Sequence, residues 1–262
     1  MIERTLEIRA SDGAMEAFIT HPSENGPFPA VIIYMDMWGW REELFDIARR
    51  VATVGYYCMV PDVYYRQGKV RFAFRNDKGQ MLSLVRLDDK SKQAVLAPMH
   101  NLTDAMVVED MASILDFMDR GEPVRPGSMG LVGYCMGGRH VLRLAGRYPR
   151  RFRATACLQG VEMVTDRDDS PHLSARVAEG EIYCGYAELD RFTPLSVISK
   201  LDETLRQGKV MHRYEVHKGA SHGYPFPERD VFDKQAFNRD WELIFGMFHR
   251  QIPPYRDLAT AR

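Results

Sequence analysis

The strongest constraint on the fold is the hexapeptide Gly133-Tyr134-Cys135-Met136-Gly137-Gly138. An apolar run at residues 129–132 leads into it, and a helix-like segment at residues 139–147 follows it. This is the strand–turn–helix setting of a nucleophile elbow, with cysteine where G-x-S-x-G has serine. The turn is so sharp that the residues two positions to either side must be small, as Gly133 and Gly137 are. We expect the turn to lift the Cys135 sulfur above the end of a sheet.

The rest of the chain alternates strand-like and helical segments. Continuous apolar runs at residues 29–35 and 56–60 are typical of strands buried on both faces. Between them, an apolar stripe with helical spacing predicts a helix over 42–54, which Gly55 ends. The alternation predicts a doubly wound α/β sheet that binds ligands at the carboxyl ends of its strands. The other expected elements are a hairpin at 5–8 and 15–20, strands at 129–132, 154–159, 181–185 and 210–217, and helices near 101–120, 139–147, 194–206 and 229–250.

Residues 64–98 interrupt this alternation. The segment has weak periodicity and is rich in arginine and lysine. We interpret it as a surface excursion or lid within one domain that spans residues 1–262. If it covers a substrate, its arginines are expected to favour anionic lactones over neutral esters, Arg71, Arg75 and Arg86 in particular.

Composition narrows the class of protein. Hydrophobic residues make up 45% and charged residues 27%, and the net charge is −1, which predicts a globular protein with no nucleic-acid surface. The N-terminus lacks the pattern of a signal peptide, and no apolar run is long enough to span a bilayer. Four cysteines without short paired spacing argue against a disulfide framework and a zinc ribbon. We therefore expect a cytoplasmic monomer or homodimer that acts on a small molecule.

A cysteine nucleophile needs a base, and the base needs an acid to orient it. In α/β-hydrolases the acid and then the histidine follow the nucleophile along the chain, each on a loop after a strand. Residues 183–190 read as a strand that runs into an acidic loop, where the spacing favours Asp190 over Glu188 as the orienting acid. His222 lies in the loop after the strand at 210–217 and is the expected base.

The loop after the strand at 29–35 is the expected source of the second oxyanion donor. We assign the two donors to the backbone N–H groups of Met37 and Met136, and we place Asp36 within reach of Cys135. Cys58, Cys157 and Cys184 lie in expected buried strands and are interpreted as small hydrophobic residues. Aromatic side chains could wall the substrate pocket or pack in the core, and the candidates are Trp38, Trp40, Tyr64, Tyr134, Phe192 and Tyr224.

These motifs resemble those of the dienelactone hydrolase (carboxymethylenebutenolidase) family of α/β-hydrolases. The likeness runs from about residue 29 to the last helix, and its most specific part is the cysteine in the elbow. The resemblance implies a Cys135–His222–Asp190 triad. It also implies hydrolysis of a lactone or ester through a thioester, with no metal or cofactor.

The chain departs from the family pattern in two places. The family usually has glutamate at the position of Asp36, where the carboxylate helps to govern the resting thiol. Members that cleave dienelactone bind its carboxylate with arginines, one of them shortly after the catalytic histidine. Here residues 224–228 are Tyr-Pro-Phe-Pro-Glu, and Arg229 comes late. The identity of the lactone or ester is therefore open.

Three other functions remain alternatives at this point. A thioesterase or a general carboxylesterase could use the same triad with a wider pocket, and a non-catalytic protein could bind a small apolar ligand. A dinucleotide-binding oxidoreductase is disfavoured, because the glycines from Gly127 to Gly137 do not fit G-x-G-x-x-G. In addition, the strand that follows ends at Gln159 and not at an acidic residue.

Overall fold

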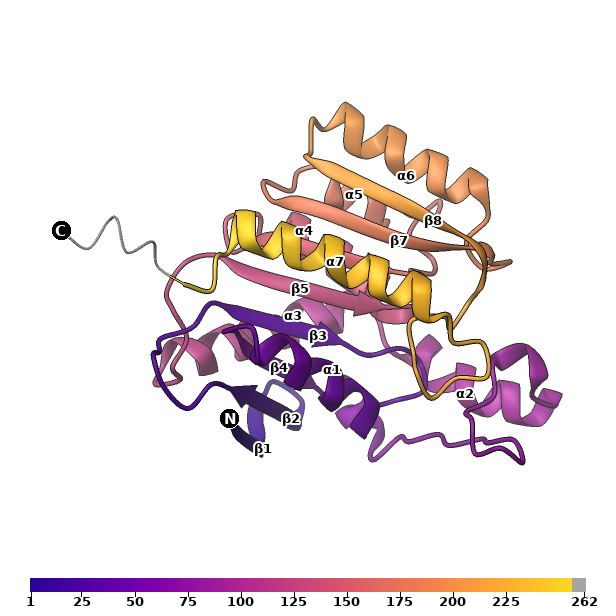
Figure 1. Ribbon diagram of the computed structural model, residues 1–262, viewed down its shortest axis with the longest axis horizontal. Helices are drawn as coiled ribbons and strands as arrows, with labels where there is room; N and C mark the ends of the chain where they lie inside the picture. Colours follow the sequence, from indigo (N-terminus) through magenta and orange to yellow (C-terminus); the bar gives the residue numbers. More distant parts are fainter. Residues whose placement is uncertain (256–262) are drawn as a thin grey trace.

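The computed structural model describes residues 1–255, so the end of the domain expected at 1–262 lies outside the described residues. Its centre is a sheet of eight strands in the order β1-β2-β4-β3-β5-β6-β7-β8. β2 pairs antiparallel with β1 and with β4, and all the other neighbours are parallel. The strands in Figure 1 are β1 (Ile2–Ala10), β2 (Gly13–His21), β3 (Ala30–Tyr34), β4 (Tyr57–Pro61), β5 (Met129–Tyr134), β6 (Phe152–Leu158), β7 (Glu181–Leu189) and β8 (His212–Ser221).

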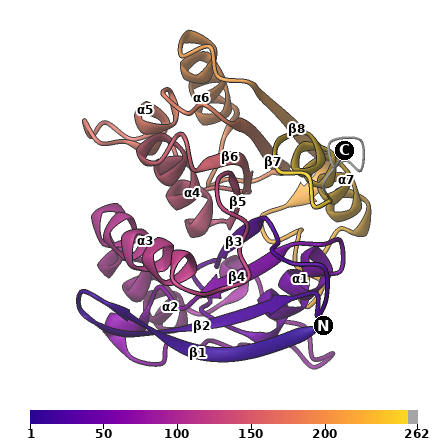
Figure 2. The ribbon, with the colours of Figure 1, turned by 90° about the vertical axis from the view of Figure 1, so that its left-hand side faces the viewer.

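Helices cover both faces of this sheet, as Figure 2 shows. One face carries α1 (Glu42–Ala52) and α7 (Lys234–Gln251). The other face carries α3 (Asp104–Asp119), α4 (Met136–Arg147), α5 (Pro171–Ala175) and α6 (Leu195–Gln207). α2 (Asp89–Asn101) lies toward the carboxyl ends of the parallel strands (Figure 1) and follows two short 3₁₀ turns, Tyr65–Gln67 and Leu84–Arg86. This confirms the predicted α/β architecture.

The apolar pattern of the sequence explains how these layers pack. Every residue of β3, β4 and β5 is buried, as expected for central strands that are covered on both sides. α1 buries Leu44, Ile47 and Val51 and packs against β2 and β4. The stripe predicted for residues 42–54 therefore faces the sheet. Among the described residues, no helix has the length and apolar character needed to cross a membrane.

The structure corrects several predicted boundaries. β7 and β8 run on to Leu189 and Ser221, so each ends directly before a candidate triad residue. α4 begins at Met136, earlier than expected, and α7 begins at Lys234, later than expected. The segment at 64–98 contains most of α2, which the sequence pattern does not predict. The apolar stripe of α2 is weak, and Pro98 lies inside the helix. The Asp88 carboxylate nevertheless caps the N-terminus of α2 by accepting the Ser91 N–H at 2.9 Å.

Candidate active site

Cys135 occupies a strained turn between β5 and α4. Its φ of 52° and ψ of −111° form a combination that residues other than glycine rarely adopt. The flanking glycines permit the turn. A Cβ on Gly133 would overlap the Gly137 carbonyl oxygen, and a Cβ on Gly137 would lie 2.6 Å from the Tyr34 carbonyl oxygen. The elbow predicted from the hexapeptide is thus the observed backbone, and strain of this kind is typical of functional sites.

The structure brings the three candidate triad residues together. His222 Nε2 lies 3.2 Å from Cys135 Sγ, and His222 Nδ1 lies 2.7 Å from Asp190 Oδ2. The other Asp190 oxygen accepts the Phe192 N–H at 2.8 Å, which fixes the carboxylate. Glu188, the alternative acid, instead accepts the Gly219 N–H at 2.8 Å. Asp190 is therefore the acid that contacts the ring of His222.

The surroundings of His222 favour its protonated form. Burial on its own lowers the pKa of the imidazole, but the neighbouring Cys135 sulfur and the hydrogen bond that the ring donates to Asp190 raise the pKa of His222 to about 10. Phe192 packs edge-on against the ring, with the centroids 5.1 Å apart. The ring is thus held between a sulfur and a carboxylate, with one part of it exposed to the cavity.

Met37 and Met136, the expected oxyanion donors, flank Cys135. Met136 is the first residue of α4, so its N–H is one of the unpaired donors at a helix N-terminus. Met37 lies on the loop after β3 and lines the cavity beside Cys135. The Tyr64 hydroxyl lies 3.3 Å from the Met37 carbonyl oxygen and 3.3 Å from Met136 Sδ. Tyr64, a candidate for the pocket wall, therefore contacts both residues that carry the expected oxyanion donors.

Asp36 is held by two arginines. Its carboxylate accepts from Arg41 at 2.6 Å and from Arg229 at 2.9 Å, as well as from the Trp38 N–H at 3.2 Å. Burial would raise the pKa of Asp36, but Arg41 and Arg229 keep it below its usual range. The Arg229 guanidinium also lies 4.1 Å from the centroid of the Trp38 ring. Arg229, seven residues after His222, is therefore part of the site although no sequence pattern places it there, and sequence reasoning missed Arg41 altogether.

The Asp36 carboxylate leads to a prediction about stability. Asp36→Asn leaves the buried Arg229 without its carboxylate partner, and we expect the free energy of unfolding to fall by about 3 kcal/mol at pH 7. Because the folded-state pKa of Asp36 is lowered, its contribution is complete above its ordinary pKa of about 3.9 and is lost as the pH falls below it. Urea unfolding at several pH values measures this difference.

The matched control is Asp116→Asn, which removes an exposed partner of Arg120 on α3. Exposed pairs of this kind contribute little to stability, so the control should keep the wild-type urea midpoint. Equal midpoints for Asp36→Asn and Asp116→Asn at pH 7 would contradict the predicted effect.

The aromatic candidates divide into two groups. Trp38 and Phe192 line the cavity beside Cys135. Tyr134 and Tyr224 do not line it and are fully buried, so of the two roles left open for them the structure shows packing in the core. Tyr134 is the last residue of β5 and lies buried against Phe226, with the ring centroids 4.8 Å apart. Tyr224 is also buried, and its hydroxyl donates to Asp240 at 2.6 Å.

The three arginines of the basic excursion at 64–98 also differ in their position relative to the cavity. Arg86 lines the cavity and pairs with Asp230 at 3.1 Å. Arg71 pairs with Asp62 at 2.8 Å and Arg75 pairs with Glu228, and neither side chain lines the cavity. Only one of the three arginines expected to contact an anionic substrate is therefore placed to do so.

Cys135 lies at the junction of two hollows that share Met37, Leu84, Phe192 and His222. The polar lobe has a volume of about 270 Å³. The apolar lobe has a volume of about 160 Å³. Beyond the shared residues, the polar lobe is lined by the polar side chains of Asp36, Gln159, Ser221, Arg86, Arg191 and Arg229 and by the apolar side chains of Trp38, Val85, Leu189 and Val231. The apolar lobe is lined by Leu96, Met99, His100, Val161 and Glu162.

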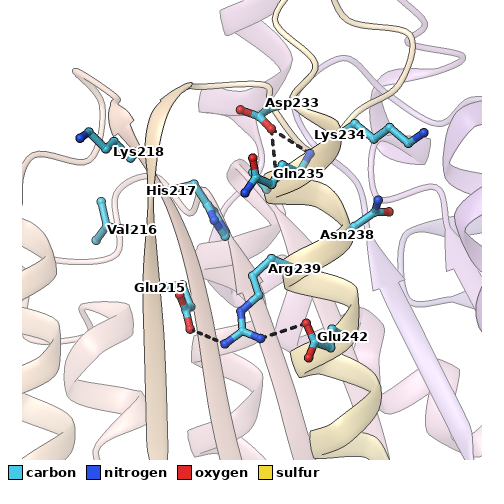
Figure 3. A pocket seen from close by; sticks show the side chains of 11 residues that line it. Glu215, Val216, His217, Lys218, Asp233, Lys234, Gln235, Asn238, Arg239 and Glu242 are labelled. Atoms are coloured by element: carbon cyan, nitrogen blue, oxygen red, sulfur yellow. Dashed lines mark hydrogen bonds and ion pairs between the residues drawn. The ribbon is translucent and has the colours of Figure 1, made fainter.

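A larger hollow of about 1050 Å³ lies between β8 and α7, and Figure 3 shows its lining. Arg239 donates to Glu215 and Glu242, and Asp233 accepts backbone N–H groups of α7, while Lys218 and Lys234 also line the hollow. His217, its one histidine, contacts the buried Asp240 at 2.6 Å. Because no cysteine, serine or threonine of residues 1–255 lines this hollow and it lies away from the strained turn, we place the candidate site at Cys135.

Comparison with known proteins identifies the family of this chain. The family model described as "Dienelactone hydrolase family" matches residues 15–252. A Methylorubrum extorquens protein with the name "Putative carboxymethylenebutenolidase" is 23% identical over 254 residues, which covers 95% of this chain and 81% of that protein. A Saccharolobus solfataricus protein of the same name is 25% identical over 260 residues, with coverage of 92% and 96%.

Solved structures show the same fold. The crystal structure titled "Putative Dienelactone Hydrolase" from Klebsiella pneumoniae superposes with a TM-score of 0.80 at 21% identity, covering 95% of this chain and 98% of that one. The match over residues 15–252 includes the elbow, Asp190 and His222. This chain belongs to the dienelactone hydrolase family of α/β-hydrolases and is a carboxylic ester hydrolase.

Proposed function

We propose that the protein hydrolyses a lactone or an activated ester through a thioester on Cys135. The observation that carries the proposal is the 3.2 Å contact between His222 Nε2 and Cys135 Sγ, with Asp190 on the other ring nitrogen. In such a pair the imidazolium stabilises the thiolate, which is the nucleophilic form of cysteine. The raised pKa of His222 supports this charge state at neutral pH.

The first half of the reaction acylates the enzyme. The Cys135 thiolate attacks the carbonyl carbon, and the resulting oxyanion accepts hydrogen bonds from the backbone N–H groups of Met37 and Met136. As the intermediate collapses, the bond from carbon to the leaving oxygen breaks and His222 gives its Nε2 proton to that oxygen. Asp190 keeps the ring oriented by accepting the Nδ1 proton in a hydrogen bond.

The second half restores the thiolate. Neutral His222 takes a proton from water, and the hydroxide adds to the thioester carbon. The carbon–sulfur bond then breaks, which releases the carboxylic acid and leaves Cys135 and His222 as the ion pair. A thiolate leaves more readily than an amine, so enol-lactones and activated esters suit this site better than amides.

A general carboxylesterase or thioesterase is the second candidate. The apolar lobe favours it, because this hollow extends the site beyond the cationic polar lobe. The two candidates share the triad and differ in their substrate. They are therefore separated by substrate preference and not by the loss of a catalytic residue.

The test is hydrolysis of dienelactone beside a neutral aryl ester, with intact-protein mass spectrometry and peptide mapping of samples quenched within one turnover. We expect an acyl adduct on the peptide that contains Cys135. Turnover of dienelactone would identify a dienelactone hydrolase, and turnover of the aryl ester alone would identify a carboxylesterase. A folded protein that turns over neither, or an adduct on another residue, would contradict the proposal.

The charge state of the site gives a separate prediction. We expect the His222 ring to titrate near pH 10 in the wild type, and in Cys135→Ser to titrate much closer to the ordinary histidine pKa of about 6.5. The hydroxyl of serine carries no charge at these pH values, so the attraction that raises the pKa is lost. Histidine ring signals in NMR spectra recorded across the pH range measure both values.

His172 is the matched control, because burial lowers the pKa of its imidazole and its ring contacts Ser170 instead of the triad. The titration of His172 should be the same in both proteins. An unchanged His222 midpoint in Cys135→Ser would show that no thiolate faces the ring.

A further inference from the structure

The apolar lobe has no part in the mechanism described above. Its volume is about 160 Å³, and it opens on Cys135 and His222. Leu96 and Met99, which are three residues apart on α2, form one wall, and Val161 contributes another. The two polar side chains that reach it beside His222, those of His100 and Glu162, belong to exposed residues. The interior of this lobe therefore presents hydrocarbon and thioether to a bound molecule.

The polar lobe surrounds the other side of the catalytic pair. It is lined by Arg86, Arg191 and Arg229, and also by Ser221 and Gly223, the two chain neighbours of His222. Ser221 and Gly223 line the polar lobe and not the apolar lobe. His222 lines both lobes, but the departing oxygen is a polar group and suits the lobe that is lined by Ser221 and the arginines, so we place the leaving group there. The acyl group then extends into the apolar lobe.

We infer that the apolar lobe is an acyl-chain pocket and that α2 sets the length of chain it accepts. The inference rests on the proposed function and names the substrate class more closely, as esters of short, unbranched, apolar acids. A volume of 160 Å³ holds roughly five groups of about 30 Å³ each, the size of a water molecule and close to that of a methylene. With the carbonyl carbon at Cys135, acyl chains of up to about six carbons fit.

The test is a series of p-nitrophenyl esters from acetyl to decanoyl, which share one leaving group. In the wild type we expect kcat/KM to rise about fourfold for each added methylene up to hexanoyl and to fall for longer chains. Leu96→Trp fills the lobe, so the ratio of kcat/KM for butyryl over acetyl should fall about tenfold. Ala94→Trp is the matched control, because Ala94 is exposed and lies on the opposite side of α2 from Leu96.

A second pair of variants keeps the test valid if Leu96→Trp fails to fold. Leu96→Ala and Met99→Ala enlarge the lobe, so the optimum should move to acyl chains longer than six carbons. A wild-type profile that is flat with chain length would overturn the inference. So would a profile that Leu96→Trp, Leu96→Ala and Met99→Ala all leave unchanged.

Failure of the proposed function can be separated from failure of this inference. Alkyl methanethiosulfonates attach an alkylthio group to a thiolate and release methanesulfinate, so they label Cys135 without any turnover. With these reagents the labelling rate should rise from methyl to pentyl, and Leu96→Trp should abolish the rise. If Cys135→Ala still hydrolyses esters, the proposed mechanism fails. If labelling of Cys135 is independent of chain length, the acyl pocket fails.

Discussion

Cys135→Ala is expected to lower kcat/KM for the preferred ester by at least four orders of magnitude, while the protein stays folded. The sulfur is the atom that would form the thioester. Because the nucleophile and the base act as one unit, loss of either one lowers the rate about as much as loss of both. Any rate that remains comes from substrate binding and the two oxyanion donors, which alanine leaves in place. Initial rates with the wild type and the variant on the same ester measure the loss.

Cys58→Ala is the matched control, because Cys58 is a buried thiol in β4, away from the cavity. It should keep wild-type kcat/KM although it makes the same change of side chain, from –CH2SH to –CH3. Iodoacetamide gives a second comparison, since Cys135 lines both lobes and the other three cysteines line neither. Alkylation of all four cysteines at similar rates, or equal activity of the two alanine variants, would contradict the assignment.

The features that were predictable from the sequence are those that local structure determines. The elbow follows from small residues two positions on either side of Cys135. These residues must be small because a Cβ on either one would meet a backbone carbonyl group. Asp190 and His222 follow from topology, because parallel strands β7 and β8 end at the same edge of the sheet as β5. A residue directly after each strand is therefore brought near the elbow.

What could not be predicted depends on contacts between distant segments. The position and charge of the Asp36 carboxylate depend on Arg41 and on Arg229, which is 193 residues away in sequence. No rule of sequence spacing relates Asp36 to Arg229. Burial of Tyr224 depends on Asp240 of α7, which its hydroxyl meets only after the chain turns back. The apolar lobe depends on α2, whose pattern is too weak to identify and whose position rests on tertiary packing.

Gly137→Ala is expected to lower kcat about 100-fold and the free energy of unfolding by about 2 to 3 kcal/mol. The new Cβ would lie 2.6 Å from the Tyr34 carbonyl oxygen and 2.7 Å from that of Met35, closer than such atoms approach in proteins. Both carbonyls belong to the end of β3 and the loop that carries Met37. To relieve the overlap, that backbone must move, and the N–H of Met37 moves with it.

The control separates this effect from the general consequence of replacing a helical glycine. Gly246→Ala in α7 places its Cβ near one atom only, the Arg250 guanidinium at 3.5 Å, so it should leave kcat unchanged and stabilise the helix by up to about 1 kcal/mol. The two substitutions thus have opposite expected signs for the same chemical change. If Gly137→Ala is as stable as the wild type but has a reduced kcat, the loss of activity still points to displaced oxyanion donors. Wild-type stability together with wild-type kcat would show that β3 and α4 do not approach as closely at the elbow as this mechanism requires.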